Sequence, residues 1–81
     1  MNYLYILKSL KDNRLYIGST TDLQRRILEH QSGEVFATKY RLPLVLLYYE
    51  AYKEEWMARK REKQLKYFGK EYQNLKKRLI L

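Results

Sequence analysis

The residues whose types and spacing could support chemistry are two tyrosines, one arginine, the single histidine and one glutamate, namely Tyr5, Tyr16, Arg26, His30 and Glu62. Arg26 and His30 are four residues apart, so in a helix they lie next to each other on one face. Glu62 lies at the edge of the apolar stripe of a second predicted helix. Burying a carboxylate there costs several kcal/mol unless it pairs with a cation or binds a metal. Metal binding by Glu62 is therefore one chemistry that this set supports.

Other kinds of site find little support, and each of the five residues also has a purely structural explanation. One histidine and no cysteine exclude the common zinc-ligand spacings, and neither a glycine-rich phosphate loop nor a serine-containing elbow is present. Tyrosines in strands usually belong to the core, and a lone histidine is usually satisfied by a hydrogen bond. Arg26 is explained equally well as a surface ion-pair partner, and Glu62 as the partner of Lys66 four residues on.

Length and composition predict one small globular domain over residues 1–81. With 46% hydrophobic residues the chain is too apolar to be disordered. Its longest apolar run, Leu42 to Tyr49, is far shorter than the roughly 20 residues of a membrane span. The chain does not open with a basic segment followed by a long apolar stretch, so we expect no secretory signal and a cytoplasmic location.

Positive charge is concentrated in the last third of the chain. Seventeen basic residues against nine acidic ones give a formal net charge of +8, of which residues 1–55 carry +1 and residues 56–81 carry +7. This asymmetry favours an anionic partner, with nucleic acid ahead of an acidic membrane surface. A solvated lysine-rich helix without any partner is the structural alternative.

Two strands joined by a short turn open the predicted fold. Residues 3–7 and 15–18 are rich in aromatic and β-branched side chains. Residues 11–13 between them include Asp and Asn, which tolerate the left-handed backbone of a turn. A hairpin of this kind brings Tyr16 alongside Tyr5 on one face of the sheet.

A helix over residues 23–30 is predicted next. Thr21 with Gln24 three residues on forms a capping-box pattern at its start, and Gly33 marks its end. Gly18 ends the strand just before it, where the missing Cβ lets backbone or ligand approach closely.

For the rest of the chain, the sequence predicts a loop, a strand and two helices. Residues 34–43 form the loop, and residues 44–50 are almost continuously apolar, which is typical of a central strand. A long helix over 54–68 is followed by Gly69 and a short final helix over 70–81. The apolar stripe of the long helix is expected to hold Met57, Ala58, Leu65 and Phe68. The predicted class is α+β, a three-stranded mostly antiparallel sheet with helices packed on it in the order β-β-α-β-α-α.

The sequence resembles the GIY-YIG nuclease family over essentially its whole length, in particular the minimal stand-alone branch similar to the N-terminal domain of the excinuclease C component. The resemblance is carried by Tyr3-Leu4-Tyr5, by Tyr16-Ile17-Gly18-Ser19-Thr20-Thr21-Asp22-Leu23 eleven residues after Tyr5, and by Arg26 and His30. Residues 43–50 and 58–66 are similar to that branch as well.

The resemblance implies a metal-dependent phosphodiester hydrolase. Tyr5 and Tyr16 would sit over the scissile phosphate, Arg26 would stabilise its charge through a bidentate contact, and His30 would assist proton transfer or orientation. Glu62 would ligate one Mg²⁺ or Mn²⁺ ion, which suits a cation that favours a single carboxylate with several retained waters. A tyrosine base starts from a pKa of about 10, which nearby cations would lower toward neutrality.

The sequence departs from the family pattern in two places. Tyr3 stands where many members have glycine, and Asn74 finds no firm match to an asparagine that many members place near the metal. Larger relatives attach a separate DNA-recognition domain, whereas here recognition is expected from the domain's own surface. The basic residues expected to bind nucleic acid are Arg59, Arg61, Lys63, Lys66, Lys70, Lys76 and Lys77.

Three functions follow from these observations. The first is a DNA nuclease selective for branched, damaged or flapped structure and weak in sequence specificity, because no element is built for major-groove readout. The second is a non-catalytic nucleic-acid-binding module with the same fold, which has no use for Glu62. A membrane-surface module ranks third because the aromatic residues of the basic segment are expected to be committed to packing. The choice between DNA and RNA, and a protein partner that supplies targeting, stay open.

Overall fold

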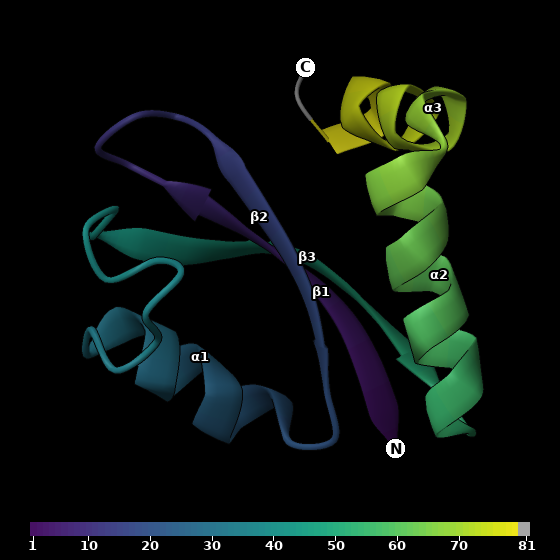
Figure 1. Ribbon diagram of the computed structural model, residues 1–81, viewed down its shortest axis with the longest axis horizontal. Coiled ribbons are helices and arrows are strands. Elements are labelled where there is room, and N and C mark those ends of the chain that lie inside the picture. Colours follow the sequence, from purple (N-terminus) through teal and green to yellow (C-terminus); the bar gives the residue numbers. More distant parts are fainter. Residues whose placement is uncertain (80–81) are drawn as a thin grey trace.

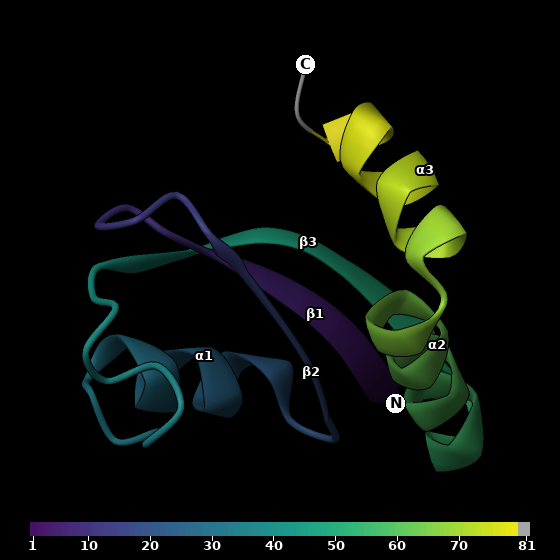
Figure 2. The same cartoon turned by 45° about the horizontal axis from the view of Figure 1, so that its top comes forward.

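A three-stranded sheet with helices on both of its faces forms the protein, as the computed structural model shows for residues 1–79. Figure 1 and Figure 2 show α1 below the sheet and α2 with α3 beside its opposite face. Both strand pairings are antiparallel and the strand order is β2-β1-β3. The α+β class and the order β-β-α-β-α-α are therefore confirmed. The elements are β1 (Asn2–Ser9), β2 (Leu15–Thr20), α1 (Leu23–Gln31), β3 (Leu44–Tyr52), α2 (Glu55–Tyr67) and α3 (Gly69–Leu79).

The central strand is β1, and the expectation that residues 44–50 form it was wrong. β1 is flanked by a strand on each side, and its residues Leu4 to Leu7 are at most 1% exposed. β3 pairs only with β1, and Val45, Leu46 and Tyr49 are exposed along it. A continuous apolar run indicates burial but does not say which strand lies in the middle.

Alternation along β1 sends neighbouring side chains into two separate clusters. The cluster on the α2 and α3 side holds Leu4, Ile6, Ile17, Leu65 and Leu75. The cluster on the α1 side holds Tyr5, Leu7 and Leu44, with Tyr16, Leu23 and Ile27 packed against it. Tyr5 and Tyr16 thus share the α1 side of the sheet, as their positions in the hairpin predict.

Local backbone chemistry fixes the hairpin turn and the ends of α1. Asn13 adopts a φ of 61°, as expected of a turn residue that tolerates left-handed backbone. The cap of α1 is Asp22, whose side chain accepts a hydrogen bond from the Arg25 amide, so the predicted Thr21–Gln24 capping box was wrong. Gly33, with a φ of 80°, ends the helix region as expected.

The break between α2 and α3 differs from the prediction. Phe68 leaves helical geometry and is 62% exposed, while Gly69 begins α3. Of the predicted apolar stripe, Ala58 and Leu65 are buried and Met57 is half-buried. The last two residues of the predicted final helix, 80 and 81, lie outside the described residues.

Arg61 on α2 forms ion pairs with residues of both β3 and α3. Its Nε lies 3.0 Å from Glu50 Oε1 on β3, and its Nη1 lies 3.2 Å from Glu71 Oε2 on α3. The hydroxyls of Tyr48 and Tyr52 also donate hydrogen bonds to Glu50. Arg61 is thus held within a half-buried network that joins β3, α2 and α3.

Candidate active site

Tyr5, Tyr16 and His30 form an aromatic cluster between the sheet and α1. The ring centroids of Tyr16 and His30 are 5.1 Å apart, those of Tyr5 and His30 are 5.6 Å apart, and those of the two tyrosines are 6.4 Å apart. The hairpin and α1 therefore bring together three residues that lie up to 25 positions apart along the chain.

His30 is fully buried and both of its ring nitrogens are engaged. Nε2 lies 2.8 Å from the Tyr5 hydroxyl, and Nδ1 lies 2.7 Å from the hydroxyl of Thr38 in the loop before β3. Burial, reinforced by the positive charge of Arg26, lowers the pKa of His30 to about 4. The imidazole is therefore neutral at physiological pH and fixed in orientation by a hydrogen bond on each side.

Gly18 makes room for the Tyr5 ring. The two residues are direct partners across β1 and β2. A Cβ added to Gly18 would lie 2.5 Å from the Tyr5 hydroxyl oxygen, closer than any real contact. A close approach at this glycine is therefore present, but the group that approaches is the Tyr5 side chain and not the backbone or ligand that was expected.

The two tyrosines differ in exposure. Tyr5 is 1% exposed, whereas Tyr16 is half-buried. Burial raises the pKa of the Tyr5 hydroxyl, and the nearby Arg26 guanidinium offsets only part of this shift. The charge of Arg26 alone therefore does not lower the pKa of Tyr5 toward neutrality, because the desolvation of Tyr5 outweighs it, and a lowering by a bound metal ion stays a prediction.

Arg26 lies on the exposed side of the cluster. Its side chain is 38% exposed and its Nη1 is 3.0 Å from Glu29 Oε1. It acts on the pKa of both Tyr5 and His30, so it lies near them, as the spacing on α1 predicts. The guanidinium is thus a cation at the edge of the aromatic cluster, held by one partly exposed carboxylate.

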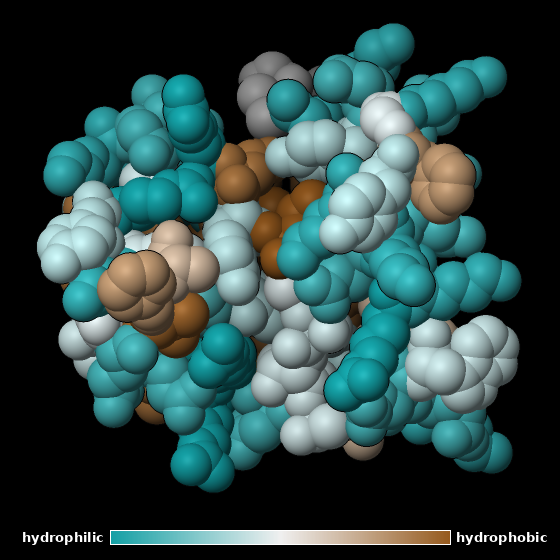
Figure 3. All heavy atoms as spheres, viewed as in Figure 1, coloured by the Kyte–Doolittle hydropathy of each residue, from teal (hydrophilic) through white to brown (hydrophobic). Residues whose placement is uncertain are grey.

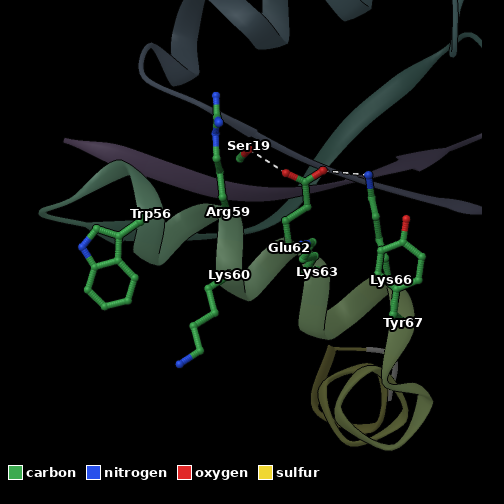
Figure 4. A pocket seen from close by; sticks show the side chains of 8 residues that line it. All are labelled: Ser19, Trp56, Arg59, Lys60, Glu62, Lys63, Lys66 and Tyr67. Atoms are coloured by element: carbon green, nitrogen blue, oxygen red, sulfur yellow. Dashed lines mark hydrogen bonds and ion pairs between the residues drawn. The ribbon is translucent and has the colours of Figure 1, made fainter.

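Glu62 reaches β2 from the opposite face of the sheet, on α2. Figure 4 shows its carboxylate between Ser19 and Lys66. The Ser19 hydroxyl donates to Oε1 at 2.6 Å, and Lys66 Nζ lies 2.7 Å from Oε2. The predicted ion pair with Lys66 is therefore present. Glu62 also contributes, as the smallest of the causes, to the raised pKa of Tyr5.

Ser19 connects the two halves of the site. It lines a depression together with Arg26, and it also lines the groove that holds Glu62. Lys66 in turn lines both that groove and a depression beside Tyr16. Ser19 therefore links the depression beside Arg26 to the groove that holds Glu62 and Lys66.

The predicted nucleic-acid-binding residues fall into three groups. Arg59, Lys63 and Lys66 line the groove beside Glu62. Lys70 and Lys77 are exposed on α3, and Lys76 is half-buried with its Nζ 5.1 Å from the Tyr72 ring centroid. Arg61, as described above, is engaged in the network with Glu50 and Glu71.

Four residues that the sequence did not single out belong to this region. Ser19 follows Gly18 directly, so strand alternation could have placed it on the opposite face, toward α2. Thr38 lies in an irregular loop, and no spacing predicts its bond to His30. Trp56 and Tyr67 line the Glu62 groove and are 60% and 75% exposed. The expectation that the aromatics of the basic segment are committed to packing was therefore wrong for these two.

The fold and the site together define a class of protein. It is a small α+β domain that carries a tyrosine–histidine–arginine cluster and one carboxylate in a neighbouring groove. Residues 1–78 match the GIY-YIG catalytic domain, so the chain belongs to the GIY-YIG family. Its curated relatives include a UPF0213 protein of Staphylococcus haemolyticus, 42% identical over 71 residues that make up 86% of this chain and 85% of that protein. A UPF0213 protein of Streptococcus pyogenes is 47% identical over 51 residues, 62% of this chain and 54% of that protein.

A solved structure of another UPF0213 protein has a similar fold. The solution NMR structure of the UPF0213 protein BH0048 from Bacillus halodurans has a TM-score of 0.58 and 34% identity, and the match covers 99% of this chain and 88% of that one. The GIY-YIG family is a nuclease family whose members generally use divalent metal ions. Within residues 1–79, no helix is long and apolar enough to cross a membrane.

Proposed function

We propose that this chain is a divalent-metal-dependent endonuclease that hydrolyses DNA phosphodiester bonds in the cytoplasm, selecting DNA structure more than sequence. The observation that carries the proposal is that Ser19 on β2 lines both the depression beside Arg26 and the groove that holds Glu62, so that one substrate can reach both side chains. An arginine, a carboxylate and a hydroxyl are the groups that phosphodiester hydrolysis requires for charge stabilisation, cation binding and proton transfer.

Arg26 is the residue proposed to hold the scissile phosphate. Its guanidinium is partly exposed and its partner Glu29 is itself 30% exposed, so a phosphate can compete for it. A planar guanidinium donates two parallel hydrogen bonds to two phosphate oxygens. The negative charge that develops in the transition state strengthens those bonds.

The two tyrosines are proposed to have different roles. Tyr16 is half-buried whereas Tyr5 is 1% exposed, so the Tyr16 hydroxyl is the one that can exchange a proton with the attacking water. Tyr5 is buried, its pKa is raised, and its hydroxyl is bound to His30. Tyr5 therefore acts as a neutral hydrogen-bonding group, and His30 is the positioning residue that holds it.

The residues around Glu62 fit a Mg²⁺ or Mn²⁺ ion that is completed by substrate. Glu62 and Ser19 supply hard oxygen donors in an open groove. Among the described residues no group of three His, Cys, Asp or Glu side chains forms a ready-made cage, which suits a cation held by one carboxylate, waters and substrate phosphate. The chemistry that the bound ion supplies is polarisation of the phosphoryl oxygen and stabilisation of the leaving oxygen. Lys66 must then give up its contact with Glu62.

The second candidate is a non-catalytic nucleic-acid-binding module. The observation that favours it is the satisfaction of Glu62 by Ser19 and Lys66, which gives the carboxylate a structural role. A module of this kind binds the same DNA but does not cut it.

Cleavage assays separate the two candidates. The purified chain is incubated with labelled duplex, single-stranded, flap and branched DNA in Mg²⁺, Mn²⁺ or EDTA. We expect cleavage in the metal-containing samples, with flap or branched DNA cut in preference to plain duplex. Binding of all these DNAs without cleavage in either metal would support the binding module and contradict the nuclease.

A further inference from the structure

The exposed face of α2 forms a groove that joins aromatic and basic side chains beside Glu62. Figure 4 shows Arg59, Glu62 and Lys66 rising from α2 toward β2, with Trp56 and Tyr67 at the two ends of the row. Trp56 is 60% exposed and Tyr67 is 75% exposed. Large aromatic rings left this open to solvent contribute nothing to the core.

The spacing of these residues follows the helix. Trp56, Lys60, Lys63 and Tyr67 recur at intervals of three and four, so they share one side of α2. The two aromatics are eleven positions apart, which at 1.5 Å per residue is about 16 Å. That length matches about five nucleotides at the 3.4 Å spacing of a stacked strand.

The cations of the groove are available to an anionic ligand. Among residues 1–79, Lys60 and Lys63 form no ion pair, and Arg59 pairs only with Glu55, which is itself 56% exposed. Exposed ion pairs of this kind contribute little free energy, so a phosphate can replace Glu55. Figure 3 shows hydrophilic side chains gathered over α2 and α3, with paler residues among them.

Aromatic rings interleaved with cations suit unpaired nucleotides better than the alternatives. Bases stack on exposed rings when they are free of a partner strand, whereas a duplex hides the faces of its bases. A membrane-bound helix needs one continuous apolar face. In α2 the buried residues Ala58 and Leu65 are turned toward the sheet, and cations separate the two exposed aromatics.

We propose that this face of α2 binds a short single-stranded DNA segment, with bases stacked on Trp56 and Tyr67 and phosphates on Arg59, Lys60 and Lys63. The inference deepens the proposed function, since it places an unpaired strand beside Glu62 and assigns flap or branched DNA as the substrate class. Its binding step does not depend on cleavage.

The test measures binding in EDTA, where no metal-dependent cleavage occurs. Trp56 is the only tryptophan, so its fluorescence reports directly on stacking. An eight-nucleotide oligo-dT should quench this fluorescence, with the same dissociation constant that anisotropy of a labelled oligo-dT gives. Trp56→Ala and Tyr67→Ala should each weaken oligo-dT binding by about 5- to 150-fold, as expected for the loss of one base stack. Affinity for a blunt duplex should change by less than about twofold.

A matched control comes from another exposed aromatic. Tyr40 is 73% exposed but does not line the α2 groove, so Tyr40→Ala should bind oligo-dT as the wild type does. Circular dichroism confirms that each variant is folded.

Each other outcome overturns the inference in an identifiable way. Unchanged fluorescence, or variants that bind oligo-dT like the wild type, would remove the stacking site. Tighter binding of oligo-rU than of oligo-dT would mean that the ligand of this face is RNA. A fluorescence shift with anionic phosphatidylserine vesicles but not with oligo-dT would mean that the ligand is a membrane surface. Failure of stacking with intact metal-dependent cleavage would contradict this inference alone. Intact stacking without any cleavage would contradict the nuclease.

Discussion

The hydroxyl of Tyr5 lies 2.8 Å from Nε2 of His30, and both side chains are at most 1% exposed. This hydrogen bond joins β1 to α1 inside a largely apolar cluster. The hydroxyl of Thr38 forms a second hydrogen bond with the same imidazole, at Nδ1. Because each polar atom has a partner, the cluster avoids the cost of unsatisfied buried groups and holds Tyr5 in one orientation.

The first prediction concerns the charge of His30. Because burial lowers its pKa to about 4, the imidazole should stay neutral down to about pH 5. The chain contains one histidine, so its imidazole signals in an NMR titration of untagged protein need no assignment by mutation. A measured pKa near 6.5 would mean that the imidazole is open to water and free to act as a general base.

The same shift makes stability depend on pH. The unfolded chain binds a proton at His30 below about pH 6.5, whereas the folded chain does not until about pH 4. The stabilisation is therefore complete above pH 6.5 and decreases as pH falls, by up to about 1.4 kcal/mol per pH unit. Urea unfolding at pH 7, 6 and 5 measures this slope. His30→Gln, which cannot titrate, should lose the part of the slope between pH 6.5 and 5.

The second prediction concerns the contact between Gly18 and Tyr5. Gly18→Ala should destabilise the fold by about 1–3 kcal/mol, because the new Cβ would lie 2.5 Å from the Tyr5 hydroxyl oxygen and force the ring to move. The matched control is Gly69→Ala, where an added Cβ has no neighbour within 4 Å. Denaturant unfolding compares the two, and equal stabilities would show that Tyr5 is not confined.

The third prediction concerns the guanidinium group of Arg26. Arg26→Lys should lower the single-turnover cleavage rate on the order of a hundredfold or more, because an ammonium cannot reproduce the bidentate contact. Arg25 is the natural control, since it also pairs with Glu29 but its side chain is 77% exposed. Arg25→Lys should cleave at close to the wild-type rate, and similar losses in both variants would place the phosphate elsewhere.

The fourth prediction separates the two tyrosines. Tyr16→Phe should reduce the single-turnover rate more than Tyr5→Phe, because Tyr16 is half-buried whereas Tyr5 is 1% exposed and bound to His30. DNA affinity should change little in either variant, since only a hydroxyl is removed. Tyr5→Phe also leaves Nε2 of His30 without its partner, so it should be the less stable of the two. The reverse order of rates would make Tyr5 the residue that exchanges the proton.

Much of the fold follows from sequence patterns, but the strand order does not. The hairpin, α1 and α2 are visible as periodic apolar positions, and the β-β-α-β-α-α order follows from them. The apolar run in β3 indicates burial just as strongly as β1 does, although β3 lies at the edge. The position of a strand depends on tertiary pairing, which one strand's own residues do not encode.

The candidate site is only partly visible in the sequence for a similar reason. Helical spacing places Arg26 beside His30, and hairpin geometry places Tyr16 beside Tyr5. The hydrogen bonds from Thr38 and Ser19 join segments that no local period relates. Charge counting assigned Arg61 to the DNA surface, whereas its position opposite Glu50 engages it inside the protein. Which basic side chains are free to bind DNA therefore depends on the carboxylates that other elements place beside them.

The measurement that tests the central claim most directly compares Glu62→Gln with the wild type in single-turnover cleavage of labelled flap DNA, with and without Mg²⁺. Gln keeps the shape of the side chain but removes its anionic charge, so the variant should lose metal-dependent cleavage by on the order of a hundredfold or more while keeping its fold and DNA affinity. The exposed pair with Lys66 contributes little stability, so unfolding should change by less than about 1 kcal/mol. If Glu62→Gln cuts at the wild-type rate, Glu62 is a structural ion-pair partner and the account of this site as a metal-dependent nuclease is contradicted.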